Sequence, residues 1–281
     1  MTWKDVIIGI GAVNIAVESH CSCNLELPEI YEKFITDRNP DIILRLHNSD
    51  PPFSLPSEKV YSSERLSTYH DGDNLITQFH IRDYRRELRD AVMKANSKEK
   101  VVDFYTTYLH PLKRFFFRYI LATILASGLG VMIHGAGIVD DENVLMCAGL
   151  SGAGKSTMAA LWKYRNCTVL SDDTLIVRKG RPPYLVYGTP WVKDTEMSSP
   201  QEFPLKAIFF IEHAPRNFLE PQKGTLATML RHTFCPRWDG AGMVFTMEFL
   251  SELMIDIPCY RLGFVPAESI VDVMREISLG L

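Results

Sequence analysis

The sequence predicts an α/β protein in which a central sheet is flanked by helices, with a small β-rich region before it. Three observations lead to this prediction. Predicted strands and helices alternate after about residue 130, which is typical of a sheet covered by helices. A glycine-rich loop at residues 149–157 lies between an apolar strand and a helix. Several segments within residues 1–95 alternate between apolar and polar residues, which is typical of strands. We therefore expect a β-rich N-terminal region at residues 1–95 and an α/β domain at residues 96–281.

The composition limits the classes of protein to which this chain can belong. The chain has 281 residues, of which 46% are hydrophobic and 23% charged, so a sizeable core is expected. A net charge of −4 implies no general attraction to nucleic acid or to a membrane surface. The longest apolar stretch, residues 119–133, is too short to span a bilayer. The six cysteines are scattered, and the pair at residues 21 and 23 is too closely spaced for a usual zinc site. These features predict a cytoplasmic protein with no nucleic-acid or membrane partner.

The N-terminal region is expected to consist of strands and turns. Residues 6–18 and 41–47 alternate between apolar and polar and predict strands. Residues 48–57 contain three prolines and predict a loop. Residues 60–81 alternate weakly about an Asp-Gly pair at 71–72, which predicts a hairpin.

Two helical segments are expected next, over residues 83–96 and 102–127. Residues 83–96 are charged and helix-compatible, and Pro111 is expected to break or start a helix. The three consecutive phenylalanines at 115–117 are expected to pack in a core rather than to stack on a substrate. Apolar residues within 102–127 recur at helical spacing: Leu109, Leu112, Phe116, Tyr119, Ile120 and Ile124.

The remaining elements follow in order. Residues 130–139 and 144–148 predict a hairpin of two strands that leads into the glycine-rich loop, and residues 158–164 have helical composition. The further expected strands are residues 167–177, 184–188, 205–212 and 257–264, and the further expected helices are 243–254 and 269–277.

Residues 149–157, GLSGAGKST, fit the P-loop pattern in its required context of a preceding strand and a following helix. Glycines let backbone N–H groups approach phosphate oxygens, and the helix N-terminus attracts anions. Lys155 can reach the β- and γ-phosphates, and the Ser156 hydroxyl can ligate Mg²⁺. The expected phosphate-binding residues are Gly149, Ser151, Gly152, Ala153, Gly154, Lys155, Ser156 and Thr157.

Asp172 and Asp173 interrupt an otherwise apolar segment. Two carboxylates there are costly unless they face a cation or hydrogen-bond donors. A P-loop needs an acidic residue near Mg²⁺, and phosphoryl transfer to a hydroxyl needs a base. Adjacent side chains on a strand point to opposite faces, so the two aspartates differ in role unless the strand ends between them. A turn with solvated carboxylates is the alternative interpretation.

Two further residues have open interpretations. His134 lies in the strand that leads to the P-loop, and it is either a buried core histidine or a site residue. Trp191 is expected to anchor a loop rather than to contact a substrate. The polar residues 192–202 that follow are interpreted as a loop over the substrate.

The combination of His134, the P-loop and Leu170-Ser-Asp-Asp173 resembles the HPr kinase/phosphorylase family, and also ATP-dependent phosphoenolpyruvate carboxykinase. The carboxykinase is the less favoured, because this chain is too short for that family. The later segments Gly188-Thr-Pro-Trp191, residues 204–213, Trp238-Asp-Gly-Ala-Gly-Met243 and Pro258-Cys-Tyr-Arg-Leu262 resemble one branch. That branch includes kinases of lasso-peptide precursors.

The resemblance implies a P-loop kinase core and a role for each matching residue. Asp172 matches the base that takes the proton of the accepting serine, and Asp173 matches the acidic residue near the metal, together with Ser156. His134 matches a histidine near the transferring phosphate, and Lys155 matches the phosphate-binding lysine. The chain lacks the family's Glu-x-Arg-Gly-x-Gly segment after the aspartates, so the reverse phosphorylase reaction is not implied.

We therefore expect a kinase that uses ATP and Mg²⁺ to phosphorylate a serine on a peptide or small protein, such as a lasso-peptide precursor. A small-molecule kinase on the same core and a non-catalytic nucleotide-binding regulator are the alternatives. The sequence leaves open whether the protein forms a homo-oligomer.

Overall fold

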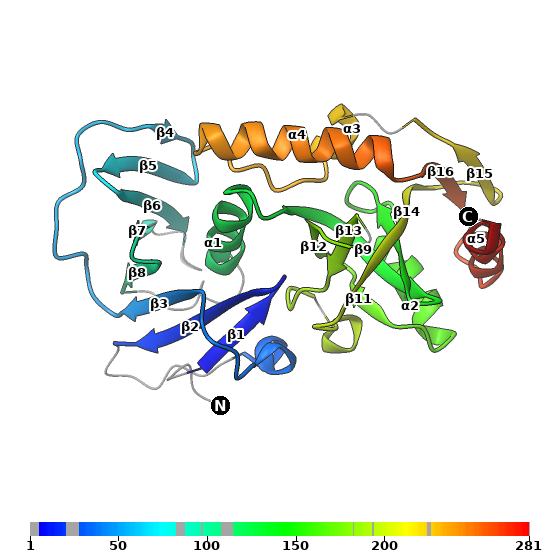
Figure 1. Ribbon diagram of the computed structural model, residues 1–281, viewed down its shortest axis with the longest axis horizontal. Helices are drawn as coiled ribbons and strands as arrows, with labels where there is room; N and C mark the ends of the chain where they lie inside the picture. The colour runs from blue at the N-terminus through cyan, green and yellow to red at the C-terminus, as the bar shows by residue number, and fades with distance from the viewer. Residues whose placement is uncertain are drawn as a thin grey trace. The chain divides into compact units, whose positions relative to one another are not determined.

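A computed structural model describes residues 6–20, 28–82, 88–96, 98–107, 115–181, 183–192, 194–223 and 226–280. The chain divides into two compact units, Met1–Tyr119 and Ile120–Leu281. Each unit contains an eight-stranded mixed sheet, and strands are more numerous than helices (Figure 1). The α/β class is confirmed. None of the helices in the described ranges has the length and apolar character needed to cross a membrane.

The first unit is built on a sheet with the strand order β1-β2-β3-β8-β7-β6-β5-β4. The hairpin predicted about residues 71–72 is present, because Asp71 pairs with Asn74 and Gly72 has a φ of +57°. The unit's elements are β1 (Val6–Ile10), β2 (Val13–Ser19), η1 (Glu29–Phe34), β3 (Ile42–His47), β4 (Tyr61–Ser62), β5 (Leu66–Asp71), β6 (Asn74–Arg82), β7 (Leu88–Asn96) and β8 (Val101–Thr106).

Two expected helical segments are strands instead. The prediction of a helix over residues 83–96 is wrong for the described part, Leu88–Asn96, which is β7. Its leucine, alanine, methionine and lysine favour helix, but pairing with β6 along its whole length and with β8 overrides that weak preference. Val101–Thr106 is β8, and its β-branched and aromatic residues suit a strand. Because β8 pairs with β3 and β7, it belongs to the first unit.

Helix α1 (Phe115–Ala126) begins in the first unit and ends in the second. Phe116 and Phe117 are buried, as expected for core residues. Phe116 packs against Phe79 and Phe104 with ring centroids 5.0 and 4.1 Å apart. The side chain of Phe115, and residues Leu109, Pro111 and Leu112, lie outside the described residues.

The second unit contains the P-loop strand at its centre. Strand β10 is antiparallel to β9 and parallel to β14, and β14 is parallel to β16. The chain of pairings β10-β9-β12-β13-β14-β10 closes on itself. The unit's elements are β9 (Val131–Asp140), β10 (Asn143–Ala148), α2 (Lys155–Tyr164), β11 (Val169–Ser171), β12 (Thr174–Lys179), β13 (Tyr184–Tyr187), η3 (Thr195–Met197), β14 (Glu202–His213), β15 (Phe218–Pro221), α3 (Leu226–Leu230), α4 (Gly240–Asp256), β16 (Cys259–Phe264) and α5 (Ser269–Gly280).

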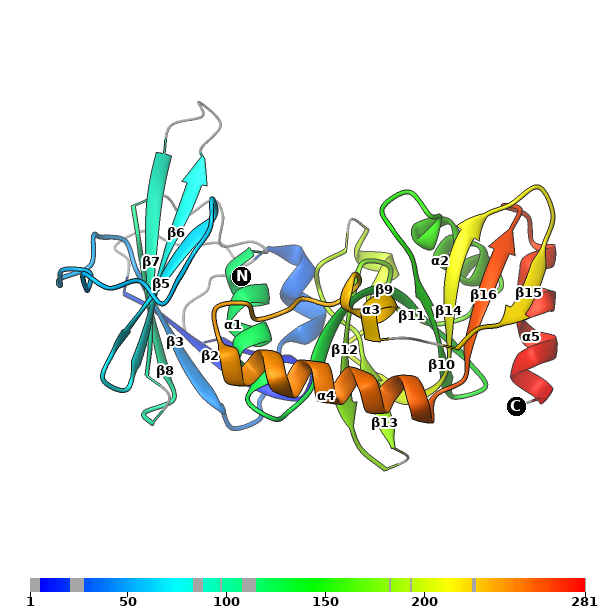
Figure 2. The same cartoon turned by 90° about the horizontal axis from the view of Figure 1, so that it is seen from above.

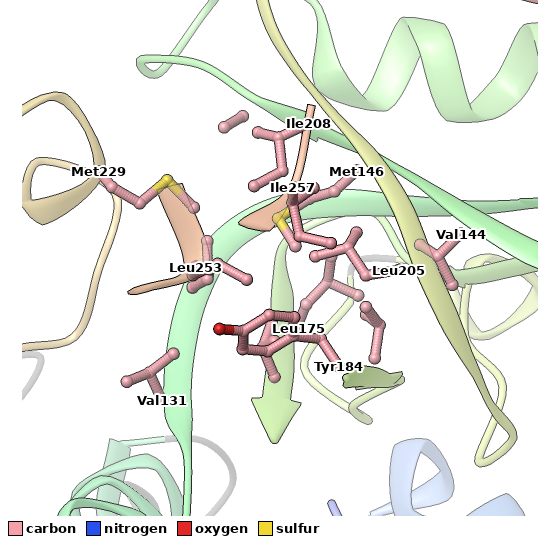
Figure 3. Close-up of a cluster of buried hydrophobic side chains, with 14 of the residues drawn as sticks. Val131, Val144, Met146, Leu175, Tyr184, Leu205, Ile208, Met229, Leu253 and Ile257 are labelled. Carbon is pink, nitrogen blue, oxygen red and sulfur yellow. The ribbon is translucent and has the colours of Figure 1, made fainter. Parts of the chain in front are cut away.

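Successive side chains of β10 point to opposite faces of the sheet, so the strand contributes to two separate core clusters. Val144, Met146 and Ala148 belong to the cluster that packs on α3 and α4, which Figure 3 shows around Tyr184. Leu145 and Cys147 belong to the cluster that packs on α2 and α5. Figure 2 shows α5 beside β15 and β16. The P-loop strand is therefore buried on both faces, which fixes the position of the loop that follows it.

Candidate phosphate-binding site

The P-loop has the strand–loop–helix context that the sequence predicts. Strand β10 ends at Ala148, and helix α2 begins at Lys155. Gly152 and Gly154 have φ values of +84° and +97°, which residues with a Cβ rarely adopt. A Cβ added to Gly154 would lie 2.5 Å from the Phe264 ring. The loop thus requires glycine at this position for both its backbone conformation and its packing.

Lys155 lies over the loop that precedes it. Its Nζ donates hydrogen bonds to the backbone oxygens of Gly149, at 2.8 Å, and Leu150, at 3.1 Å. Only 7% of the residue is exposed. Burial lowers the pKa of the Lys155 ammonium, and the carboxylates of Asp173 and Asp172 partly offset this shift. The ammonium therefore lies within electrostatic reach of both aspartates.

The sheet register brings the aspartates to the same edge as the P-loop. Ala148 pairs with Gly135 on β9, and the adjacent His134 pairs with Thr174 on β12. The segment predicted as one strand over residues 167–177 is interrupted at the two aspartates, between β11 and β12. The Ser171 hydroxyl accepts hydrogen bonds from the backbone N–H groups of residues 173 and 174 at 3.2 and 3.1 Å, which stabilises this bend.

Asp173 is tied to its neighbours by several contacts. Its backbone oxygen accepts hydrogen bonds from His134 Nδ1 at 2.7 Å and from the Gly135 N–H at 3.1 Å. One carboxylate oxygen lies 3.4 Å from His134 Nδ1, and the other accepts a 3.0 Å hydrogen bond from the Thr174 hydroxyl. Both the Asp173 and the His134 side chains are about one-third exposed. His134 is therefore held beside Asp173 and is partly rather than fully buried.

Asp172 has a different environment. It is 8% exposed, and its buried Oδ1 has no hydrogen-bond partner among the residues that the structure describes. Burying a carboxylate oxygen without a donor is costly, and such atoms are rare in folded proteins. Asp172 thus keeps a buried carboxylate oxygen that has no donor among the described residues, unlike the carboxylate of Asp173.

Two histidines that sequence reasoning missed also lie at this edge. His232 is 7% exposed and within electrostatic reach of Lys155 and His134. His213 donates a 3.0 Å hydrogen bond from Nε2 to the Gly152 oxygen and stacks on Phe264 at a centroid distance of 5.4 Å. His213 ends a strand parallel to β10, a position where ligands often bind, so its place in the sequence offered a signal. No local pattern marks His232.

The segment predicted as a loop over the substrate is attached to the core. Trp191 is fully buried and serves as an anchor, as the sequence suggested. Ser199 donates from its backbone N–H to the Leu170 oxygen at 3.1 Å, and Ser198 forms a bridge with Ser171. These contacts hold residues 198–199 against β11 beside the aspartates.

The oxygen groups at the site suit Mg²⁺. The expected ligands are the exposed Ser156, in the first turn of α2, and Asp173. Mg²⁺ in phosphate sites is commonly held by one or two protein oxygens, with phosphate and water oxygens as the other ligands. Within the described ranges, no group of three or more His, Cys, Asp or Glu is placed to hold a metal ion.

Comparison with protein-family models and with curated protein sequences gives no match for this chain.

Proposed function

We propose that the protein is an ATP- and Mg²⁺-dependent kinase that phosphorylates a serine hydroxyl on a peptide or small protein. The observation that carries this proposal is the placement of Asp172 and Asp173 within electrostatic reach of Lys155, the lysine of an intact P-loop. A loop that only binds nucleotide needs no second carboxylate beside the γ-phosphate position, whereas transfer to a hydroxyl needs a base there.

Each residue takes the part that its surroundings favour. Lys155 and the loop N–H groups bind the β- and γ-phosphates and neutralise charge that develops during transfer. The Asp172 carboxylate accepts the proton of the serine hydroxyl. His134 lies against Asp173 and helps to fix the position of that carboxylate. Mg²⁺ bound to Ser156, Asp173 and the phosphates would supply additional positive charge at the transferring group.

The serine acceptor follows from the resemblance to HPr-kinase-like proteins rather than from a binding surface. A direct test is mass spectrometry of the purified protein with ATP, MgCl₂ and peptides encoded beside its gene, with HPr as a control. A gain of one phosphate on a serine is expected.

Two variants separate catalysis from binding. Lys155→Ala should abolish ATP binding and transfer. Asp172→Asn should retain ATP binding and lower the transfer rate by about 10²–10⁴-fold, the usual contribution of a general base. If Asp172→Asn transferred phosphate as fast as the wild type, its role as a base would be refuted. If ATP bound normally and no peptide, protein or small-molecule hydroxyl were ever labelled, the protein would be a nucleotide-binding regulator.

A further inference from the structure

The buried His232 side chain has no role in the mechanism above. It follows α3, is 7% exposed, and its ring lies 6.3 Å from that of Phe210. Its ring nitrogens make no hydrogen bond within the described part of the chain, where its bonds are those of the backbone. These nitrogens are not among the fully buried polar atoms that lack a partner, so they lie where solvent or a ligand can reach them, although most of the residue is buried.

The backbone fixes the position of His232 independently of its side chain. Its carbonyl oxygen accepts a 2.6 Å hydrogen bond from the His134 N–H. The next residues continue along β9, where Thr233 forms a bridge with Ile133 and the Phe234 N–H donates to the Met132 oxygen at 2.9 Å. His232 is therefore held at the strand that carries His134.

The electrostatic surroundings keep the imidazole neutral. Burial lowers the pKa of His232 most, and the positive charges of Lys155, His134 and Arg231 lower it further. A neutral imidazole has one N–H donor and one acceptor nitrogen. A ring N–H at the strand that carries His134, within electrostatic reach of Lys155, is suited to the same anion that Lys155 would bind.

Resting on the kinase function proposed above, we propose that His232 is a further catalytic residue, whose ring N–H donates a hydrogen bond to an oxygen of the transferred phosphoryl group. In the reaction, the bond between the γ-phosphorus and the bridging oxygen breaks, and the serine oxygen forms a new bond to phosphorus. The serine proton passes to the Asp172 carboxylate, and ADP leaves. His232 neither gains nor loses a proton, and acts by stabilising the negative charge on the phosphoryl oxygens.

The test uses a mimic of the transferring phosphoryl group, so that the acceptor need not be known. The full-length wild type and His232→Leu are titrated with ADP and MgCl₂, with and without aluminium fluoride. His232→Leu should bind ADP as the wild type does, and should bind ADP with aluminium fluoride about 10²-fold more weakly, in line with the loss of one donor to a transition-state oxygen. His232→Gln retains an N–H donor and should recover part of this loss. His70→Leu, which alters an exposed histidine on β5, should bind both as the wild type does.

A second measurement uses only the wild-type protein, so a variant that fails to fold cannot affect it. In wild-type protein with ¹⁵N-labelled histidine, the His232 ring signals should shift on addition of a non-hydrolysable ATP analogue, and much less with ADP. If His232→Leu bound the aluminium fluoride complex as tightly as the wild type, the inference would be overturned and the kinase proposal would stand. If the wild type bound neither ADP nor the complex, the kinase proposal itself would fail.

Discussion

His213 donates a hydrogen bond from Nε2 to the backbone oxygen of Gly152, 3.0 Å away, and so connects the end of β14 to the middle of the P-loop. Because the His213 ring also stacks on Phe264 at the end of β16, two parallel strands support one side of the loop. The aspartates lie beyond β9 on the other side of β10. The P-loop is thus supported from one side and faces the proposed chemistry on the other.

Replacing His213 by alanine should weaken nucleotide binding without affecting the base. A hydrogen bond of this kind contributes about 1 kcal/mol, so the dissociation constant for ATP should rise roughly fivefold. Isothermal titration of ATP with His213→Ala, and with His70→Ala as the control, measures this effect. An unchanged affinity would show that the P-loop keeps its conformation without the histidine.

Gly188 is expected to tolerate no side chain. A Cβ there would lie 2.0 Å from the Ser199 oxygen and 2.4 Å from the Leu170 oxygen, and both are backbone atoms that cannot easily move. Gly188→Ala should lower the free energy of unfolding by roughly 3 kcal/mol or more, as expected for a severe buried clash.

The matched control is Gly240→Ala, at the start of α4, where an added Cβ meets no atom within 4 Å. That variant should change stability by less than about 1 kcal/mol, because alanine favours helix over glycine. Urea denaturation of both variants gives the comparison, and equal losses of stability would contradict the packing around residue 188.

Cys147 should not react with alkylating agents in the folded protein. It is fully buried in β10, and burial raises the pKa of its thiol to about 12, although Lys155 acts in the opposite direction. Iodoacetamide at pH 8, followed by peptide mass mapping, should leave Cys147 unmodified until denaturant is added. The half-buried Cys235 offers an internal comparison and should react sooner. Rapid native labelling of Cys147 would contradict this burial.

The buried His232 should also make stability depend on pH. The pKa of His232 in the folded protein lies below the ordinary value of 6.5, so protonation favours the unfolded chain. This effect is absent well above pH 6.5 and grows as the pH falls below 6.5 toward the folded-state value. His232→Leu should therefore lose less unfolding free energy than the wild type between pH 7.5 and pH 5.5. His70→Leu should follow the wild type, and parallel losses in all three proteins would refute the explanation.

Local patterns in the sequence predicted the P-loop because that motif is made of adjacent residues with strict backbone requirements. The hairpin of β9 and β10 was predicted for the same reason. β7 and β8 were predicted as helix. Their residues have weak or mixed conformational preferences, so pairing with strands distant in the sequence decides that they form strands.

The sequence by itself determined that a glycine-rich loop with the P-loop pattern follows a buried strand, and that two aspartates lie further along the chain. Only the tertiary structure decided that Asp172 and Asp173 lie in a bend within reach of Lys155, and that Asp172 retains an unbonded oxygen. It also brought His213 to the loop from a position about 60 residues away in the chain, and His232 to the strand that carries His134 from about 100 residues away. The physical reason is that strand pairing and side-chain burial join segments far apart in sequence, and no local spacing encodes which segments meet.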